Sequence, residues 1–383
     1  MITRKKAAET FSPGEYIRDE LEARGWTQSD LAEIMGRPIP MVNEVANGKR
    51  AITLKTAQEL GEAFETGPEF WLNLQSMYTA GQANRPATAI AKRAGLYSIA
   101  PVREMIRRGW IEEPNNVDAL AESLKRFFEV ESLDEDLPLV PHAARKSVSY
   151  GVVTPELRAW LYRAYKLAQN ITAGVFSNSG LNEAFERLSH IRHAAEETRH
   201  VSRILNDAGI RFIVLQHLAR TRIDGTCLWL NEKSPVVVIS LRYDRLDWFW
   251  FTLLHELKHV KARDGLGESN QPLDVDLVGR KAIKTDEKPA SEQYADRFAE
   301  DFLVPKTELD NFIARVRPLY SKERITGFAR RIGVHPALVV GQLMNREEIS
   351  YFHRREMLEK VKRIIVPSTL TDGWGSIVQT PNV

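Results

Sequence analysis

Two histidines and a glutamate have a spacing in the sequence that suits metal chemistry: His255, Glu256 and His259. On an α-helix, residues four apart lie on one face, so both imidazoles can reach one zinc ion at about 2.0–2.1 Å. Glu256, next to the first histidine, would then act as the general base. The preceding stretch, residues 248–254, is almost entirely apolar. A buried helix bearing three polar groups needs a reason, because unpaired buried polar groups cost free energy.

A third metal ligand is predicted further along the chain. Glu292 lies 33 residues after His259, and Asp296 follows it by one helical turn. Glu292 can complete the ligand set, while Asp296 can accept a hydrogen bond from a ligand imidazole. Four other carboxylates remain as rival ligands: Asp286, Glu287, Glu300 and Asp301. With a single cysteine in the chain, Cys227, the histidines and carboxylates must supply the ligands of any bound zinc.

A different chemistry is indicated near the N-terminus, where two short helices can pack across a tight turn. Counting from Gln28, the fifth residue is Ala32, the ninth Gly36, the fifteenth Val42 and the eighteenth Val45. Ala32 allows a close helix crossing and Gly36 can adopt the positive φ of the turn. The two valines would bury the second helix against the first. These offsets predict a helix-turn-helix.

The elements that must position these residues follow from hydrophobic periodicity. Helices are predicted throughout residues 12–80, with caps at Ser12, Thr27 and Thr53, and in much of residues 81–205. Three strands of an antiparallel sheet are predicted at residues 210–215, 226–230 and 236–241. Helices 245–263 and 289–303 would carry the two metal-site motifs. The residues after Val366 suggest a poorly ordered tail.

The stretches TQSDLAEIMG, VNEVANGKRAIT and PEFWLNLQSMY resemble XRE-type regulators of the HigA antitoxin group over residues 12–80. The resemblance implies that the helix at residues 38–47 enters the major groove of DNA. The residues nearest the base edges would be Met41, Asn43 and Glu44. Phosphates would be contacted by Gln28 and by Lys49 or Arg50. Residues 1–80 carry 9 basic and 12 acidic residues, a net charge of −3, so tight binding to DNA would require local basic clusters and a homodimer.

The stretches RYDRLDWFWFTLLHELKHV and SEQYADRFAEDFLVP resemble the ImmA/IrrE metallopeptidases, from about Ala208 through FARRIGVHPALVVGQL. The resemblance implies a zincin-like domain that hydrolyses a repressor-type protein. Its ligands would be His255, His259 and Glu292, and its base Glu256. Tyr294 and His335 are candidate oxyanion donors. Lys258 is expected to be solvated and Cys227 to be a core residue.

The expected fold class is therefore multidomain: an all-α helix-turn-helix domain at residues 12–80, a helical linker region at 81–205, an α+β metallopeptidase domain at 206–345, and a helical extension and tail at 346–383. Without a secretory signal or an apolar run of about 18 residues, we expect a cytoplasmic protein.

Two functions fit this organisation. The first is a DNA-binding regulator carrying a zinc metallopeptidase that cleaves a repressor, either itself or a partner. The alternative is a HigA-like antitoxin and autorepressor, encoded with a toxin, whose zinc domain is structural or metal-sensing and does not catalyse. Either protein would bind an operator, expected at its own promoter.

Overall fold

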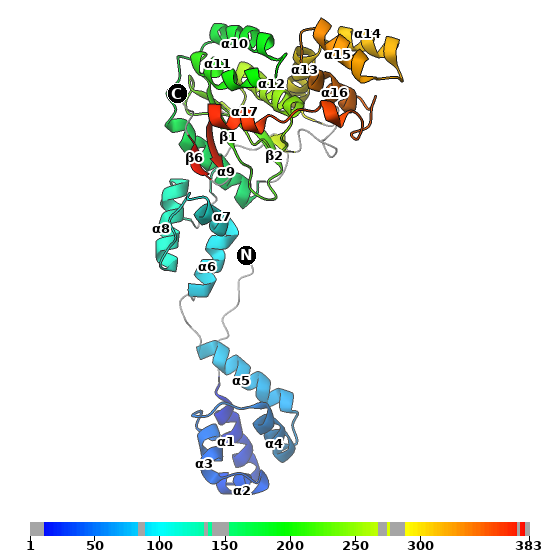
Figure 1. The fold of residues 1–383 in the computed structure, drawn as a ribbon. Coiled ribbons are helices and arrows are strands. Elements are labelled where there is room, and N and C mark those ends of the chain that lie inside the picture. Colours follow the sequence, from blue (N-terminus) through cyan, green and yellow to red (C-terminus); the bar gives the residue numbers. More distant parts are fainter. Residues whose placement is uncertain are drawn as a thin grey trace. The chain divides into compact units, whose positions relative to one another are not determined.

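The computed structural model describes residues 11–82, 89–133, 137–139, 153–266, 274–275, 288–373 and 376–379. The chain forms two compact units, Met1–Ile90 and Ala91–Val383 (Figure 1). Both the helical front and the mixed α/β rear agree with the predicted multidomain fold class. None of the described helices combines the length and the apolar character needed to cross a bilayer.

The first unit contains five helices: α1 (Pro13–Arg24), α2 (Gln28–Ile34), α3 (Ile39–Ala46), α4 (Leu54–Phe64) and α5 (Pro68–Gln82). Ser12, Thr27 and Thr53 cap α1, α2 and α4, as predicted, by accepting hydrogen bonds from backbone N–H groups of the first turn. Their apolar faces enclose a core in which Trp71 and Phe64 are almost fully buried. Capping thus sets where these helices begin, and the shared core sets how they pack.

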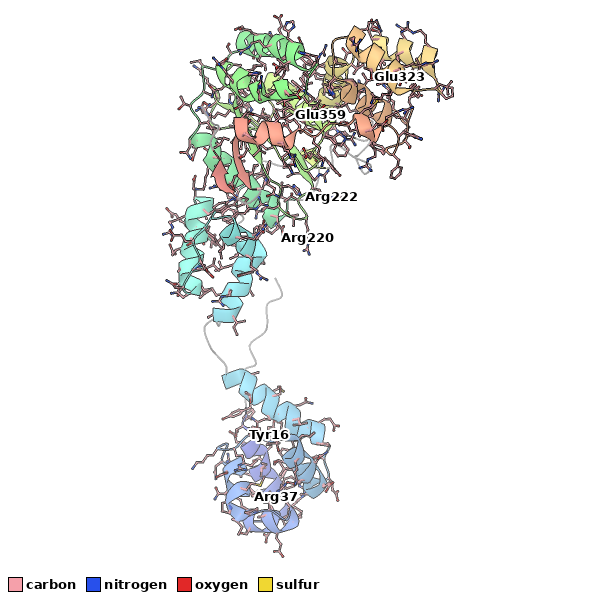
Figure 2. The ribbon with its side chains drawn as sticks, in the orientation of Figure 1. Tyr16, Arg37, Arg220, Arg222, Glu323 and Glu359 are labelled. Carbon is pink, nitrogen blue, oxygen red and sulfur yellow. The ribbon has the colours of Figure 1, made fainter. Side chains whose placement is uncertain are left out.

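The predicted turn between α2 and α3 is present in this unit. Gly36 has a φ of 61°, the left-handed conformation that the turn requires. Ala32, Val42 and Val45 are buried between the two helices. Arg37 (Figure 2), directly after the turn, donates hydrogen bonds from Nε to both carboxylate oxygens of Glu59 on α4, at 3.0 and 3.1 Å. The turn is therefore tied to the rest of the unit.

The second unit is built on a six-stranded sheet in the order β4-β2-β3-β1-β5-β6. Its strands are β1 (Arg211–Leu215), β2 (Ile223–Trp229), β3 (Pro235–Ile239), β4 (Asp274–Val275), β5 (Leu370–Gly373) and β6 (Ser376–Gln379). The prediction of three strands near these positions is confirmed, but the prediction of a purely antiparallel sheet was wrong. β1 runs parallel to both β3 and β5, and β2 pairs antiparallel with β3.

Twelve helices accompany this sheet: α6 (Ala89–Ile99), α7 (Val102–Arg107), α8 (Val117–Phe128), α9 (Pro155–Gln169), α10 (Asn178–Ile191), α11 (Val201–Asp207), α12 (Leu246–Ala262), α13 (Ala290–Leu303), α14 (Lys306–Val316), α15 (Lys322–Arg331), α16 (Pro336–Asn345) and α17 (Lys362–Ile365), among the described residues. Short 3₁₀ turns lie at Glu196–His200, Arg355–Met357 and Val366–Ser368.

The sheet separates two hydrophobic cores because successive side chains of a strand point to opposite faces. Val236 and Val238 pack with residues of α8 and α9, whereas Val237 and Ile239 pack with residues of α12, α13 and α16. Helices α8 and α9 contact each other, with the ring centres of Phe128 and Tyr162 5.0 Å apart. The region expected to be a helical linker therefore covers one face of the sheet.

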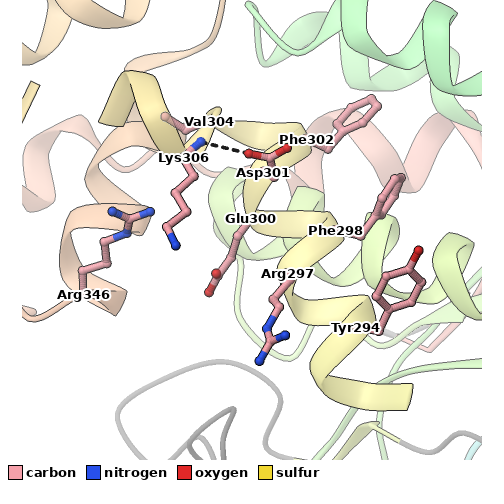
Figure 3. Close-up of a pocket in the computed structure, with 9 residues that line it drawn as sticks. All are labelled: Tyr294, Arg297, Phe298, Glu300, Asp301, Phe302, Val304, Lys306 and Arg346. Carbon is pink, nitrogen blue, oxygen red and sulfur yellow. Dashed lines mark hydrogen bonds between the residues drawn. The ribbon is translucent and has the colours of Figure 1, made fainter. Parts of the chain in front are cut away.

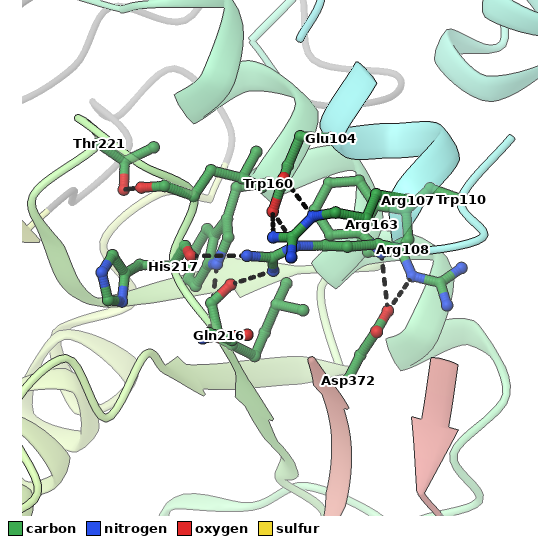
Figure 4. A network of polar contacts seen from close by, with 12 residues as sticks. Glu104, Arg107, Arg108, Trp110, Trp160, Arg163, Gln216, His217, Thr221 and Asp372 are labelled. Atoms are coloured by element: carbon green, nitrogen blue, oxygen red, sulfur yellow. Dashed lines mark hydrogen bonds and ion pairs between the residues drawn. The ribbon is translucent and has the colours of Figure 1, made fainter. Parts of the chain in front are cut away.

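A polar network joins α7 and α9 to the segment after β1 and to strand β5 (Figure 4). Arg108, after α7, donates to the carbonyls of Gln216 and His217 just beyond β1, at 2.8 and 2.9 Å. Arg163 on α9 donates to the buried carboxylate of Asp372 on β5 at 2.5 Å. The prediction of a poorly ordered tail was therefore wrong for residues 370–373 and 376–379, which extend the sheet.

Candidate metal centre and helix-turn-helix surface

Helix α12 carries the predicted metal motif into the interior of the second unit. It begins at Leu246, with Asp247 in its first turn, and ends at Ala262, because Arg263 adopts the left-handed conformation with a φ of 62°. Its apolar residues pack against both the sheet and α13, so residues 252–260 are buried. His255 and Glu256 are fully buried and His259 is 1% exposed. The motif is therefore a buried feature, as the apolar residues before it indicate.

The three predicted ligands converge on one point. His255 Nε2 lies 3.0 Å from His259 Nε2 and 3.1 Å from Glu292 Oε2, and His259 Nε2 lies 3.3 Å from the same oxygen. Ligand atoms about 2.0–2.1 Å from a tetrahedral zinc ion would be about 3.3–3.4 Å apart. Of the residues that the structure describes, these three form the group with metal-ligand geometry.

A carboxylate lies close to the far side of each imidazole, an arrangement that suits a cation between the two rings. His255 Nδ1 lies 3.0 Å from Asp296 Oδ1, and His259 Nδ1 lies 2.8 Å from Asp264 Oδ2. If each Nδ1 donates its proton to a carboxylate, each Nε2 is left with a lone pair. Two lone pairs and a carboxylate oxygen of Glu292 then face one another. These electron-rich atoms would repel one another, but a divalent cation placed between them could be coordinated by all three.

Two further observations fit a cation here. Glu292 is fully buried, and its Oε1 has no hydrogen-bond partner among the described residues. Burial opposes a positive charge on His259, but its hydrogen bonds with Asp264 and Glu292 outweigh burial and raise its pKa above the ordinary value. The electrostatics of the pocket thus favour positive charge, and the donor set of two imidazoles and one carboxylate is the type that zinc accepts.

Glu256 lies against the backbone of β2. A Cβ atom added at Gly225 would stand 2.4 Å from Glu256 Oε1 and 2.8 Å from Thr252 Cγ2. The strand can therefore come this close only because residue 225 lacks a side chain. The arrangement holds the Glu256 carboxylate in a confined position beside the ligands, as expected for a residue that receives a proton.

Two supporting residues were not anticipated from the sequence. Asp264 follows the end of α12, and Trp229 Nε1 on β2 donates to its carbonyl at 2.8 Å. Lys288, just before α13, is buried and its Nζ lies 2.8 Å from Asp296 Oδ2. Burial alone would raise the pKa of Asp296, yet His255 and Lys288 hold it below its ordinary value. The HELKHVKARD stretch could have suggested Asp264; no local signal indicates Lys288.

The rival ligands do not join this cluster where they are described. Asp286 and Glu287 lie outside the described residues. Glu300 accepts a hydrogen bond from Asn345 Nδ2 at 2.9 Å, and burial raises its pKa. Asp301 accepts from the backbone N–H of Lys306 at 2.9 Å. Both line a hollow of about 940 Å³ beside α13 and α14 (Figure 3), away from the three ligands.

Three other predictions can be placed in the structure. Lys258 was expected to be solvated, which was wrong: it is 8% exposed, with its ammonium 4.0 Å from the ring centre of Tyr294. Tyr294 itself is 60% exposed. His335 caps α16 by accepting from Ala337 N–H at 3.1 Å. Cys227 is a buried core residue of β2, as expected.

The residues predicted to contact DNA lie on or just beyond α2 and α3: Gln28, Met41, Asn43, Glu44, Lys49 and Arg50. Met41 and Gln28 are half-buried and the other four are exposed. Arg50 Nε donates to Glu44 Oε2 at 2.8 Å, so two of these side chains form an ion pair with each other. Of the two basic residues in this set, Arg50 is therefore paired, whereas Lys49 has no carboxylate partner among the described residues.

Comparison with protein families divides the chain in the same way. Residues 17–71 match the helix-turn-helix family, and residues 207–343 match the IrrE N-terminal-like domain. The second match spans α12 and α13 and so includes all three proposed ligands. Both predicted resemblances are therefore confirmed at the level of the family.

The similar individual proteins described here match about a fifth of this chain. A Haemophilus influenzae protein described as an uncharacterized HTH-type transcriptional regulator is 40% identical over 77 residues, which cover 20% of this chain and 68% of that protein. Virulence-associated protein A' of Dichelobacter nodosus is 37% identical over 71 residues, or 18% of this chain and 62% of that protein.

Among solved structures, an addiction module antidote protein of the HigA family from Coxiella burnetii is 38% identical, covering 20% of this chain and 83% of that chain, with a TM-score of 0.19. The Pseudomonas aeruginosa antitoxin HigA with the higBA promoter is 36% identical over the same shares of the two chains, also with a TM-score of 0.19.

Proposed function

Because this chain belongs to the helix-turn-helix regulators through residues 17–71 and carries an IrrE N-terminal-like domain at residues 207–343, we propose that it is a DNA-binding transcriptional regulator with a zinc-dependent peptidase domain. The peptidase would act on a repressor-type protein, either this chain itself or a partner. The observation that supports this most is the convergence of His255, His259 and Glu292 beside Glu256.

In this proposal the chain's own residues have distinct tasks. His255, His259 and Glu292 would hold zinc, which when bound supplies Lewis-acid chemistry at a peptide carbonyl. Glu256 would accept the proton of the attacking water and pass it to the leaving amine. Asp296 and Asp264, whose carboxylates lie 3.0 and 2.8 Å from the two Nδ1 atoms, would orient the imidazoles by accepting hydrogen bonds from them.

The proposal can be tested by measuring zinc content and proteolysis together. The purified chain is expected to bind about one zinc per molecule. The Glu256→Gln variant should keep its zinc and lose hydrolysis of a co-incubated repressor. A chain that neither contains nor is stabilised by zinc would refute the metal site, and retained cleavage by Glu256→Gln would refute the role of Glu256.

At the other end of the chain, we propose that α3 reads an operator in the chain's own promoter, with Asn43 contacting a base and Lys49 a phosphate. Homodimerisation would add the second set of contacts that a domain with net charge −3 needs. Affinity for the promoter fragment should fall with increasing salt. Asn43→Ala should reduce the preference for operator over unrelated DNA, whereas Lys49→Ala should weaken both. Failure to bind at low salt would contradict the proposal.

A second candidate function is favoured by the similar structures, which include a HigA-family antidote protein and the antitoxin HigA. In that case the chain would be an autorepressor that neutralises a cognate toxin, and the zinc domain would sense metal or stabilise the fold. The Glu256→Gln variant separates the two candidates, since an antitoxin with a structural zinc would retain every function in this variant.

A further inference from the structure

Lys288 is a buried cation at the rear of the candidate metal centre. It lies two residues before the start of α13, and its side chain is only 2% exposed. Its Nζ is 2.8 Å from Asp296 Oδ2, while Asp296 Oδ1 is 3.0 Å from His255 Nδ1. The three side chains therefore form a continuous buried line that ends at a proposed ligand.

Burying an ammonium group is unfavourable unless a charged or polar partner compensates. Among the described residues, Lys288 forms an ion pair with Asp296, which is 1% exposed. The carbonyl of Lys288 also accepts a hydrogen bond from Gln293 Nε2 at 2.9 Å, which fixes the backbone at this point. Lys288 is thus anchored at both its backbone and its side chain, directly behind Asp296.

We infer that Lys288 is a positioning residue for the metal centre, which acts through Asp296. By engaging one carboxylate oxygen, it turns the other towards His255 Nδ1. That contact keeps the proton of His255 on Nδ1 and directs the lone pair of Nε2 at the point shared with His259 and Glu292. This inference rests on the metal site of the proposed function, but not on peptide hydrolysis.

Lys288 differs from the other buried lysine near the ligands. Lys258 faces the rings of Tyr294 and Phe298, at 4.0 and 5.0 Å from their centres. Its contacts join α12 to α13 through aromatic faces. Lys288 instead contacts the carboxylate that reaches a ligand, so its removal should alter metal binding and not only packing.

A double-mutant cycle on the full chain tests this role. Zinc affinity would be measured by competition with a chromophoric chelator for the unaltered chain, Lys288→Met, Asp296→Asn and the double variant. Each single change should weaken zinc binding by about 10–100-fold, the usual cost of losing a partner of a metal-ligating histidine. If Lys288 acts through Asp296, Lys288→Met should cost little more once Asp296 is Asn.

Two further variants guard the interpretation. Lys261→Met removes an exposed lysine of α12 that contacts Asn182, and it should leave zinc affinity unchanged. Lys288→Gln retains a hydrogen-bond donor and should weaken binding less than Lys288→Met does. Circular dichroism of each apoprotein would show whether the fold persists. If Lys288→Met fails to fold, Lys288→Gln takes its place in the cycle.

The outcomes separate this inference from the proposed function. Equal losses from Lys288→Met in both backgrounds, or no loss in the unaltered background, would overturn the positioning role alone. Zinc binding with the expected dependence between the two residues, but without proteolysis, would overturn the peptidase alone. An unaltered chain that binds no zinc would overturn both.

Discussion

Glu256 can act as a base only if strand β2 leaves room for its carboxylate, and Gly225 provides that room. We predict that Gly225→Ala lowers proteolysis by at least about tenfold, because displacement of a catalytic group by even 1 Å is costly. Zinc affinity should change little, since Gly225 contacts Glu256 and Thr252 and not the ligands. Gly327→Ala on α15 is the matched control, because an added Cβ meets nothing within 4 Å there.

Asp264 provides a second test at the level of single residues. Its carboxylate lies 2.8 Å from His259 Nδ1 and should fix the orientation of that ring. Asp264→Ala is expected to weaken zinc binding by about 10–100-fold, measured by chelator competition. Asp207→Ala, which removes a surface ion pair with Arg187, should have no effect. Unchanged zinc affinity in Asp264→Ala would show that His259 is oriented by other contacts.

The three proposed metal ligands could be identified in the sequence because helical periodicity is local. His255 and His259 share a helix face whatever the surrounding fold, and Glu292 with Asp296 repeats the same relation on α13. Lys288 could not be predicted, because its contact with Asp296 depends on how the chain turns into α13. Its burial depends on the packed unit and not on a local pattern.

At the level of elements, strand order was the part of the fold that the sequence could not provide. The runs at β1, β2 and β3 were recognisable from their β-branched residues, and a sequential meander is the simplest arrangement of three such runs. The structure instead inserts β3 between β2 and β1. β5 joins the other side of β1 from more than 150 residues away in sequence. Such long-range pairing leaves no trace in short segments of sequence.

The pair of Arg37 and Glu59 should stabilise the packing of the turn against α4. We predict that Glu59→Gln lowers the free energy of unfolding of the first unit by about 0.5–1 kcal/mol at neutral pH. Hydrogen exchange of the backbone amides of this unit would measure the change. Glu62→Gln, an exposed neighbour on α4, should have little effect.

The same pair predicts a pH dependence. The hydrogen bonds from Arg37 hold the pKa of Glu59 below its ordinary value of 4.5. A depressed carboxyl pKa contributes stability above the unfolded-state pKa, and this contribution is lost as the pH falls through the folded-state pKa. The difference between the unaltered chain and Glu59→Gln should therefore be full at pH 7 and disappear in acid. A difference that persists below the folded-state pKa would contradict the ion-pair explanation.

At the level of the whole molecule, the two units have separate hydrophobic cores. A metal bound by His255, His259 and Glu292 should therefore stabilise residues 91–383 and leave residues 11–82 unaffected. Zinc at about 100 times its dissociation constant should add about 2.7 kcal/mol to the second unit. Hydrogen exchange with zinc and with a chelator would measure both units in one experiment. Equal protection of the two units by zinc would contradict the assignment of the site.

The position of β5 in the sheet has a consequence for synthesis of the protein. β1 lies between β3 and β5, and β5 is made only after about 150 further residues have left the ribosome. Until then, one side of β1 presents unpaired backbone groups, a template for intermolecular strand pairing. The five helices of the first unit, by contrast, all lie within residues 13–82 and can pack as soon as that segment has been made. During translation, a helix-turn-helix unit can therefore complete its fold while the sheet behind it still has an open edge, and a chain stopped before residue 370 would be prone to aggregate.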